Sequence, residues 1–171
     1  MREDIRKKAK LRVDCEKTLI RTVTFNRYML TEELGIDRER ISLPRHGYGY
    51  FVKSQGRPEG DARIYFFSLG NLRRSPFRQL CSVLEVEGLQ SNNIVAGLVN
   101  FYPNGRKVCR QYMRQGVGSR LLERIIQDLK EQDAQALFLA TRTPTMISFV
   151  EKKGFKYVAD TILGTEFYLL L

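Results

Sequence analysis

Two glycines, Gly116 and Gly118, lie one residue apart directly before an amphipathic helical pattern. Glycine at a helix entry lets the backbone approach a ligand closely and turn several N–H groups outward. The first N–H groups of a helix have no intrahelical partner, and the helix dipole favours negative charge there. The spacing therefore predicts a site for a phosphate or pyrophosphate group, although a tight turn before an ordinary packed helix would use the same residues.

The residues after the glycines predict a helix with one apolar face. Its apolar stripe consists of Val117, Leu121, Leu122, Ile125, Ile126 and Leu129. Two common phosphate loops fit poorly here. The Gly-Lys-Ser/Thr ending of a nucleotide P-loop is absent, and Leu121 takes the place of the third glycine of a dinucleotide fingerprint.

A strand and a second helix follow this first helix. Residues 136–140 are a short apolar run, which is typical of a strand covered on both faces. Thr143 and Pro144 suit the N-cap and the first position of a helix, and Gly154 suits its C-terminal end. Residues 155–159 and 166–171 predict two closing strands.

In this order of motifs, residues 108–157 resemble the acyl-CoA-binding half of the GNAT superfamily of N-acyltransferases. In that family a strand leads into Arg/Gln-x-x-Gly-x-Gly/Ala, whose amides hold the CoA pyrophosphate, and Gly116 and Gly118 match this loop. A later helix of the family ends Phe-Tyr-Glu-Lys-x-Gly-Phe, and residues 149–155 read Phe-Val-Glu-Lys-Lys-Gly-Phe. The resemblance implies an acyl-CoA site formed by Val108, Arg114, Gln115, Gly116, Val117, Gly118, Ser119, Thr143 and Phe149.

Two positions depart from the family pattern. Met113 replaces the first Arg/Gln of the loop, and Val150 replaces the tyrosine that often protonates the leaving CoA thiolate. Valine cannot donate a proton. Another group or solvent must then do this work, or the chain binds CoA without efficient catalysis.

The resemblance also implies the fold and the reaction. The expected fold is a single α+β (mixed α/β) domain over residues 1–171, with a mostly antiparallel twisted sheet. Residues 1–105 would form the acceptor side, and residues 106–171 the acyl-CoA-binding half. Parallel strands 106–112 and 136–141 would splay apart to admit pantetheine. The amine would attack the thioester directly after a carboxylate or a water chain removes its proton.

The pattern before the loop predicts mostly helix over residues 14–35 and strands over residues 47–53 and 62–69. Between these strands, residues 56–61 have the composition of a turn. A hairpin of strands is predicted over residues 81–89 and 94–102.

Candidates for the catalytic groups come from the predicted strands 81–89, 106–112 and 155–159. Glu85 and Glu87 would share one face of an alternating strand. If that face lines the cleft, one of them could act as the base; if it faces water, both are ordinary surface carboxylates. Tyr112 and Tyr157 are either proton donors or packing residues. Cys109 is either an acyl carrier or an inert buried thiol. None of these residues is assigned as catalytic.

Composition agrees with a cytoplasmic enzyme that holds no metal. The chain has 171 residues, 43% of them hydrophobic, which suits one domain with a real core. Its 3 cysteines are scattered, and His46 is its single histidine, so neither a disulfide framework nor a zinc site is indicated. The charged first residues do not suit a secretory signal, and no apolar run reaches the roughly 20 residues that span a bilayer.

The formal net charge of +10 has two readings. Basic clusters, among them residues 106–114 before the glycine loop, are either solvated surface or a site for an acidic partner. Charge at residues 106–114 would attract the phosphates of CoA, and the remaining clusters would suit RNA or a ribosome.

The sequence thus predicts an N-acyltransferase that transfers acetyl from acetyl-CoA, or an acyl group from another acyl-CoA, to an amine. The acceptor would be a small molecule, a protein or an RNA-linked amine. The alternative is a CoA-binding or nucleic-acid- or ribosome-associated protein on the same scaffold with little or no transferase activity. The strand over residues 166–171 would allow pairing across a homodimer.

Overall fold

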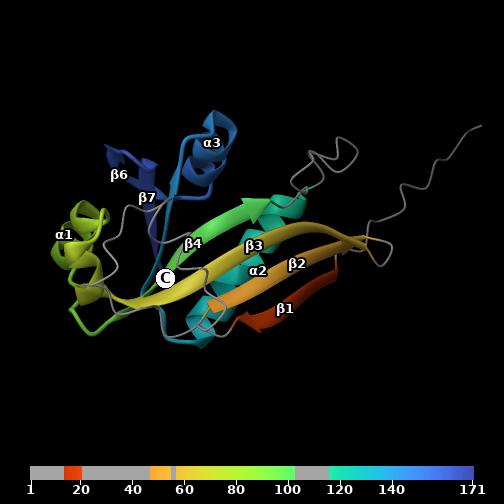
Figure 1. Ribbon diagram of the computed structural model, residues 1–171, viewed down its shortest axis with the longest axis horizontal. Coiled ribbons are helices and arrows are strands. Elements are labelled where there is room, and N and C mark those ends of the chain that lie inside the picture. The colour runs from red at the N-terminus through yellow and green to blue at the C-terminus, as the bar shows by residue number, and fades with distance from the viewer. Residues whose placement is uncertain (1–13, 21–46, 55–56, 103–115) are drawn as a thin grey trace, which may run out of the picture.

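A computed structural model of the chain describes residues 14–20, 47–54, 57–102 and 116–171. Figure 1 shows their arrangement. The elements in chain order are β1 (Asp14–Ile20), β2 (Gly47–Ser54), β3 (Arg57–Ser68), the 3-10 helix η3 (Leu69–Arg74), α1 (Arg78–Val86), β4 (Ile94–Tyr102), α2 (Val117–Glu131), β5 (Ala136–Thr141), α3 (Pro144–Lys152), β6 (Lys156–Thr161) and β7 (Gly164–Leu170).

The described strands form one seven-stranded sheet in the order β1-β2-β3-β4-β5-β7-β6. Every neighbouring pair is antiparallel except β4 and β5. This parallel pairing is short, because it joins only Val95–Gly97 of β4 to residues 136–138 of β5. Beyond Gly97 and Phe138 the two strands are no longer paired and form a fork. The predicted mixed α/β fold, with a mostly antiparallel sheet and one splayed parallel pair, is therefore confirmed.

The parallel partner of β5 differs from the predicted one. We expected residues 106–112 beside β5, but the structure places β4 there, and residues 106–112 lie outside the described residues. The burial of β4 explains this position. Val95, Ala96 and Leu98 are all buried, so both faces of the strand are covered, as the centre of a sheet requires.

The predicted strand over residues 81–89 is wrong, because this segment contains most of helix α1. Glu85 and Glu87 alternate with apolar residues at the period of a strand, which led to the prediction. The residues that are buried, however, are Leu80, Cys81 and Leu84, which follow helical spacing. Val86, which a half-buried strand would cover, is 90% exposed.

The predicted helix over residues 14–35 is wrong over its first part. Residues 14–20 form β1, which pairs antiparallel with β2 from Asp14 opposite Lys53 to Ile20 opposite Gly47. The β-branched residues Thr18 and Ile20 suit a strand, and pairing with β2 outweighs the helical spacing. Residues 21–35 lie outside the described residues. The predicted turn is also shorter than expected, since β3 begins at Arg57.

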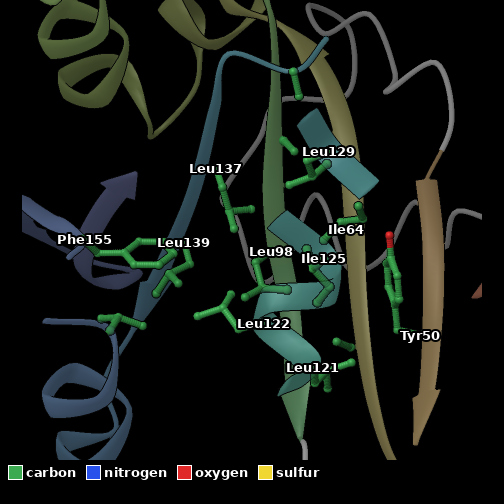
Figure 2. Packing of buried hydrophobic residues seen from close by; sticks show 14 of the residues in the cluster. Tyr50, Ile64, Leu98, Leu121, Leu122, Ile125, Leu129, Leu137, Leu139 and Phe155 are labelled. Carbon is green, nitrogen blue, oxygen red and sulfur yellow. The ribbon is translucent and has the colours of Figure 1, made fainter. Parts of the chain in front are cut away.

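Helices cover both faces of the sheet. On one face, α2 packs Leu121, Leu122, Ile125 and Leu129 against sheet residues such as Leu98, as Figure 2 shows. Val150 of α3 joins this core. On the other face, η3 and α1 pack against the sheet; their core contains Leu72, Phe77, Leu80 and Leu84, together with Phe67, Val95, Phe138 and Tyr168.

The strand β7 lies inside the sheet, between β5 and β6. Its residues pair with β5 from Leu170 opposite Ala136 to Thr165 opposite Thr141, and its other edge pairs with β6. A strand with both edges paired has no backbone groups left for a neighbouring molecule. The predicted pairing of residues 166–171 across a homodimer is therefore wrong. No helix within the described ranges has the length and apolar character needed to cross a membrane.

A buried polar contact fastens α2 to the sheet. Asp128 of α2 is 4% exposed. It accepts a hydrogen bond from the Tyr50 hydroxyl at 3.0 Å and another from Arg124 Nε at 3.1 Å. The side chain of Tyr50 is fully buried, so this contact joins β2 to α2 through the core.

The substitution Tyr50→Phe is expected to lower the free energy of unfolding by about 1–3 kcal/mol, since a hydrogen bond to a buried carboxylate is lost. Chemical denaturation measures this change. The control is Tyr157→Phe, because Tyr157 is 57% exposed and its hydroxyl donates only a long 3.4 Å bond to Asp160. An equal loss in both variants would contradict the role of the Tyr50–Asp128 contact.

Candidate functional site

The glycine loop ends where α2 begins. Gly116 is the N-cap of α2 and adopts the left-handed conformation, with φ of 76°. L-amino acids other than glycine rarely adopt this conformation, so the sequence choice has a backbone reason. The carbonyl of Gly116 accepts the first helical bond, from the amide of Arg120, at 3.0 Å. Among the described residues no side chain caps this end, and the first amides of a helix have no intrahelical partner.

The structure places part of the predicted acyl-CoA site together. Gly116, Gly118 and Ser119 lie at the start of α2, with Gly116 exposed and the other two half-buried. Figure 1 shows the end of β4 next to this start. Val108, Arg114 and Gln115 lie outside the described residues, and Val117 is described only as the first residue of the helix.

The other two predicted site residues belong to α3. Thr143 is its N-cap and Pro144 its first residue, as predicted, and Gly154 follows its end with φ of 85°. The Thr143 side chain does not cap the helix; its backbone amide donates to the Thr141 hydroxyl at 3.2 Å. Phe149 stacks on Phe101 of β4, with ring centroids 5.7 Å apart. This contact joins α3 to the open end of the fork.

A cavity of about 160 Å³ lies at the fork of β4 and β5. Its lining includes the last paired residues of the two strands and the first unpaired ones. Every lining residue is apolar or glycine: Phe67, Leu72, Phe77, Gly97, Leu98, Val99, Phe138, Leu139, Ala140 and Leu163. Phe77 and Phe138 meet edge to face at 5.0 Å between ring centroids. The sequence did not reveal this cavity, because its walls come from segments far apart in the chain.

Glu85 and Glu87 do not form the predicted pair on one strand face. Glu85 lies in α1 and accepts two hydrogen bonds from Arg73, at 2.9 and 2.5 Å. Glu87 follows α1 and accepts hydrogen bonds from the Tyr168 hydroxyl at 2.5 Å and from Lys156 at 3.0 Å. The bond from Tyr168 and then the bond from Lys156 lower the pKa of Glu87. Both carboxylates fasten α1 to its surroundings, and neither lines the cavity.

The remaining candidates do not gather at the fork either. Val150, at the position where the family has a tyrosine, is fully buried in the core beneath α3. Tyr157 lies on β6, largely exposed, with its ring edge on to Phe167. Tyr112 and Cys109 lie outside the described residues.

Sequence reasoning missed one ionisable group, Glu166 of β7. This side chain is fully buried, and within the part of the chain that the structure describes neither carboxylate oxygen has a hydrogen-bond partner. Burial raises the pKa of Glu166 to about 7, although the nearby Thr161 hydroxyl lowers it in part. The sequence signal that could have identified Glu166 is its place as the single acidic residue in the apolar run of residues 166–171.

Glu166 lies beside the cavity. In the register of β5 and β7 it stands opposite Ala140, which lines the cavity, and directly opposed residues share a face of the sheet. A carboxyl group with a pKa near neutrality can both accept and donate a proton. The described residues contain no group of three or more His, Cys, Asp or Glu side chains that could hold a metal ion.

Comparison with known proteins identifies what this chain is similar to. The model of the acetyltransferase (GNAT) family matches residues 37–155. Among solved structures, FeeM, an N-acyl amino acid synthase from uncultured soil microbes, aligns with a TM-score of 0.57 and 13% identity, over 93% of this chain and 91% of its own. An IAA acetyltransferase from Bacillus cereus ATCC 14579 aligns with a TM-score of 0.52 and 13% identity, over 92% of this chain and 100% of its own.

A third structure, an acetyltransferase from Thermus thermophilus, has a TM-score of 0.48 and 16% identity. It aligns over 73% of this chain, which spans 64% of that protein's length. No curated protein sequence matches the chain significantly. At these identities, the similarity to FeeM and to the Bacillus cereus protein shows the fold.

Proposed function

This chain belongs to the acetyltransferase (GNAT) family, and on that basis we propose that it is an acyl-CoA-dependent N-acyltransferase. The observation that carries the proposal is the fork of β4 and β5 next to the start of α2. Among the described residues, the fork leaves backbone groups of both strands without a partner in the other strand, and the left-handed Gly116 opens a helix whose first amides have no side-chain cap and would bind an anion.

The proposed donor is acetyl-CoA or another acyl-CoA. Its pyrophosphate would bind at the start of α2, to the amides around Gly116, Gly118 and Ser119, and Val108, Arg114, Gln115 and Val117 would complete the loop. Thr143 and Phe149 would border pantetheine from α3. The proposed division is thus an acceptor side in residues 1–105 and a donor side in residues 106–171, with β4 as one wall of the gap.

The proposed reaction is direct attack of a neutral amine on the thioester carbonyl. The nitrogen–carbon bond forms, the carbon–sulfur bond breaks, and CoA leaves as a thiol after it takes up a proton. Val150 cannot supply this proton. Glu85 is hydrogen-bonded to Arg73, and Glu87 is hydrogen-bonded to Tyr168 and Lys156. Glu166 is a described carboxyl group with a pKa near neutrality, but its side chain is fully buried and does not line the cavity, so it is not assigned as the base.

Titration calorimetry with acetyl-CoA and with desulfo-CoA tests the donor site. We expect micromolar binding of both compounds, and we expect Gly118→Val to weaken it by at least about 30-fold, which is about 2 kcal/mol. The added side chain would stand between the pyrophosphate and the helix amides. Thermal unfolding of the variant checks that it remains folded.

The matched control is Gly88→Val, which adds the same side chain after α1, where nothing lies within 4 Å of the added Cβ; because φ of 99° strains the backbone of this variant, its thermal unfolding is measured as well. Binding to this variant should equal that of the wild type. Equal affinity in Gly118→Val would show that the loop is only a turn. If neither compound binds the wild-type protein, the proposal fails, and RNA binding that weakens as salt rises would support the alternative of a nucleic-acid-associated protein.

A further inference from the structure

The cavity at the fork has the chemistry of a site for a hydrocarbon chain. None of its lining residues has a polar side chain, so the polar part of its wall is backbone, and no side chain there can pair with an ammonium group, a hydroxyl or a carboxylate. A hydrocarbon chain loses nothing by leaving water for such surroundings and gains the hydrophobic contribution of burial. An apolar ligand is therefore favoured over the polar head of an amine acceptor.

The position of the cavity indicates which hydrocarbon chain it would bind. Its lining includes Gly97–Val99 of β4 and residues 138–140 of β5, where the pairing of the two strands ends. Under the proposed function, pantetheine lies between these strands and its thioester reaches the closed end of the fork. The group attached to the thioester carbonyl would then enter the cavity.

The segment between β3 and β4 forms the far wall of the cavity. Leu72 of η3 and Phe77 before α1 complete the lining together with Phe67 of β3. Salt bridges hold this segment, with Arg73 joined to Glu85 within it and Glu87 joined to Lys156 of β6. The depth of the cavity is therefore set by the η3–α1 segment.

The volume of the cavity limits the size of the acyl group that it can hold. A cavity of about 150 Å³ with apolar walls holds benzene, a molecule of six carbon atoms. The cavity of about 160 Å³ thus matches a chain of about six carbons and is much larger than the methyl group of acetyl. We propose that the acyl donor of this protein is a medium-chain acyl-CoA of about six carbons, whose hydrocarbon tail lies in this cavity. This inference rests on the proposed function.

Calorimetric titration with acetyl-, butanoyl-, hexanoyl-, octanoyl- and decanoyl-CoA tests the proposal. Each buried methylene is worth about a fourfold gain in affinity, so hexanoyl-CoA, with four more methylenes, should bind roughly 250-fold more tightly than acetyl-CoA. Affinity should stop rising at about six to eight carbons, once the cavity is full.

Two variants assign the chain-length preference to the cavity. Ala140→Leu adds three carbon atoms inside it and should shorten the preferred chain by about three carbons, so that hexanoyl-CoA loses far more affinity than acetyl-CoA. Gly97→Ala acts independently, because its Cβ would lie 2.8 Å from Cζ of Phe138 and 3.3 Å from Cε2 of Phe67, so the rings must shift. The control is Ala159→Leu, on β6 opposite Glu166 and outside the cavity lining, which should leave the profile unchanged.

The outcomes separate this inference from the proposed function. If acetyl-CoA and hexanoyl-CoA bind equally well, the protein binds CoA but the cavity takes no acyl chain. If the preference for hexanoyl-CoA persists in full in both Ala140→Leu and Gly97→Ala, the chain binds elsewhere and the assignment is wrong. If no CoA thioester binds, the proposed function fails, and the inference fails with it.

Discussion

Replacing Glu166 by glutamine is expected to remove about 3 kcal/mol of pH dependence from the stability of the protein. Burial raises the pKa of this carboxyl group from its ordinary value of 4.5 to about 7 in the folded protein. Each pKa unit corresponds to about 1.4 kcal/mol, which gives the expected size of the effect. Because both oxygens are buried without a hydrogen-bond partner among the described residues, the ionised form is the costly one.

The direction of the effect follows from proton linkage. Between pH 4.5 and about 7 the folded protein holds a proton on Glu166 that the unfolded chain has released. The free energy of unfolding therefore falls as the pH rises through this interval and remains lower above it. Urea denaturation of the wild type and of Glu166→Gln, at about pH 4.5 and about pH 8, measures the difference between their slopes.

Glu87→Gln is the control for this experiment. Hydrogen bonds from Tyr168 and Lys156 lower the pKa of Glu87, so its contribution to stability is present at neutral pH and lost as the pH falls below its ordinary range. The control should thus reduce the loss of stability toward acid and leave the fall toward pH 7 in place. If Glu166→Gln shows the same fall between about pH 4.5 and 8 as the wild type, Glu166 is not the group responsible.

The substitution Gly164→Ala is expected to lower the free energy of unfolding by about 3–5 kcal/mol. Gly164 is the first residue of β7 and has φ of 125°, and a Cβ at this position would lie 2.6 Å from the carbonyl oxygen of Thr141 and 2.7 Å from its carbon. Both are backbone atoms of β5, so relief requires movement of a central strand. Thermal and urea unfolding of the variant measure the loss.

Gly154→Ala separates backbone strain from the clash. Gly154 also has a positive φ, of 85°, but nothing lies within 4 Å of an added Cβ. This variant should lose only about 1 kcal/mol, from the left-handed conformation alone. Losses of equal size in the two variants would contradict the role of the contact with Thr141.

The second half of the fold was predictable because its signals are local. Gly116 before α2, Thr143 and Pro144 at the start of α3, and Gly154 after its end each depend on a single turn of backbone. The apolar run of β5 likewise needs no knowledge of its neighbours to indicate a buried strand. These elements and their order agree with the prediction.

The elements that were mispredicted depend on distant contacts. The alternation of residues 82–87 suits a strand, but the core beneath α1 receives Leu80, Cys81 and Leu84, and that core is built by Phe67, Phe138 and Tyr168 from other strands. Residues 14–20 are a strand because β2 pairs with them. Local pattern cannot decide between helix and strand in such cases.

The acid–base chemistry of the site was the least predictable part. Glu85 and Glu87 were noticed for their spacing, whereas Glu166 owes its raised pKa to burial among strands that lie together only in the folded protein. The apolar cavity has the same origin, since Leu72, Gly97, Phe138 and Leu163 come from four separate segments. The spacing of residues along the chain does not indicate which distant side chains lie together in the folded protein.

The short pairing of β4 with β5 has a consequence for how the chain folds. It divides the sheet into two antiparallel blocks, β1 to β4 on one side and β5, β7 and β6 on the other. Within the blocks every strand pair has a contact between residues at most 27 positions apart, whereas every pair across the seam is 41 positions apart. The seam between the blocks joins Val95 to Ala136 and requires closure of the intervening chain, α2 included. Contacts of such long sequence separation form slowly, because loop entropy is lost before the contacts stabilise it. The seam that divides the sheet is thus the step on which the folding rate depends.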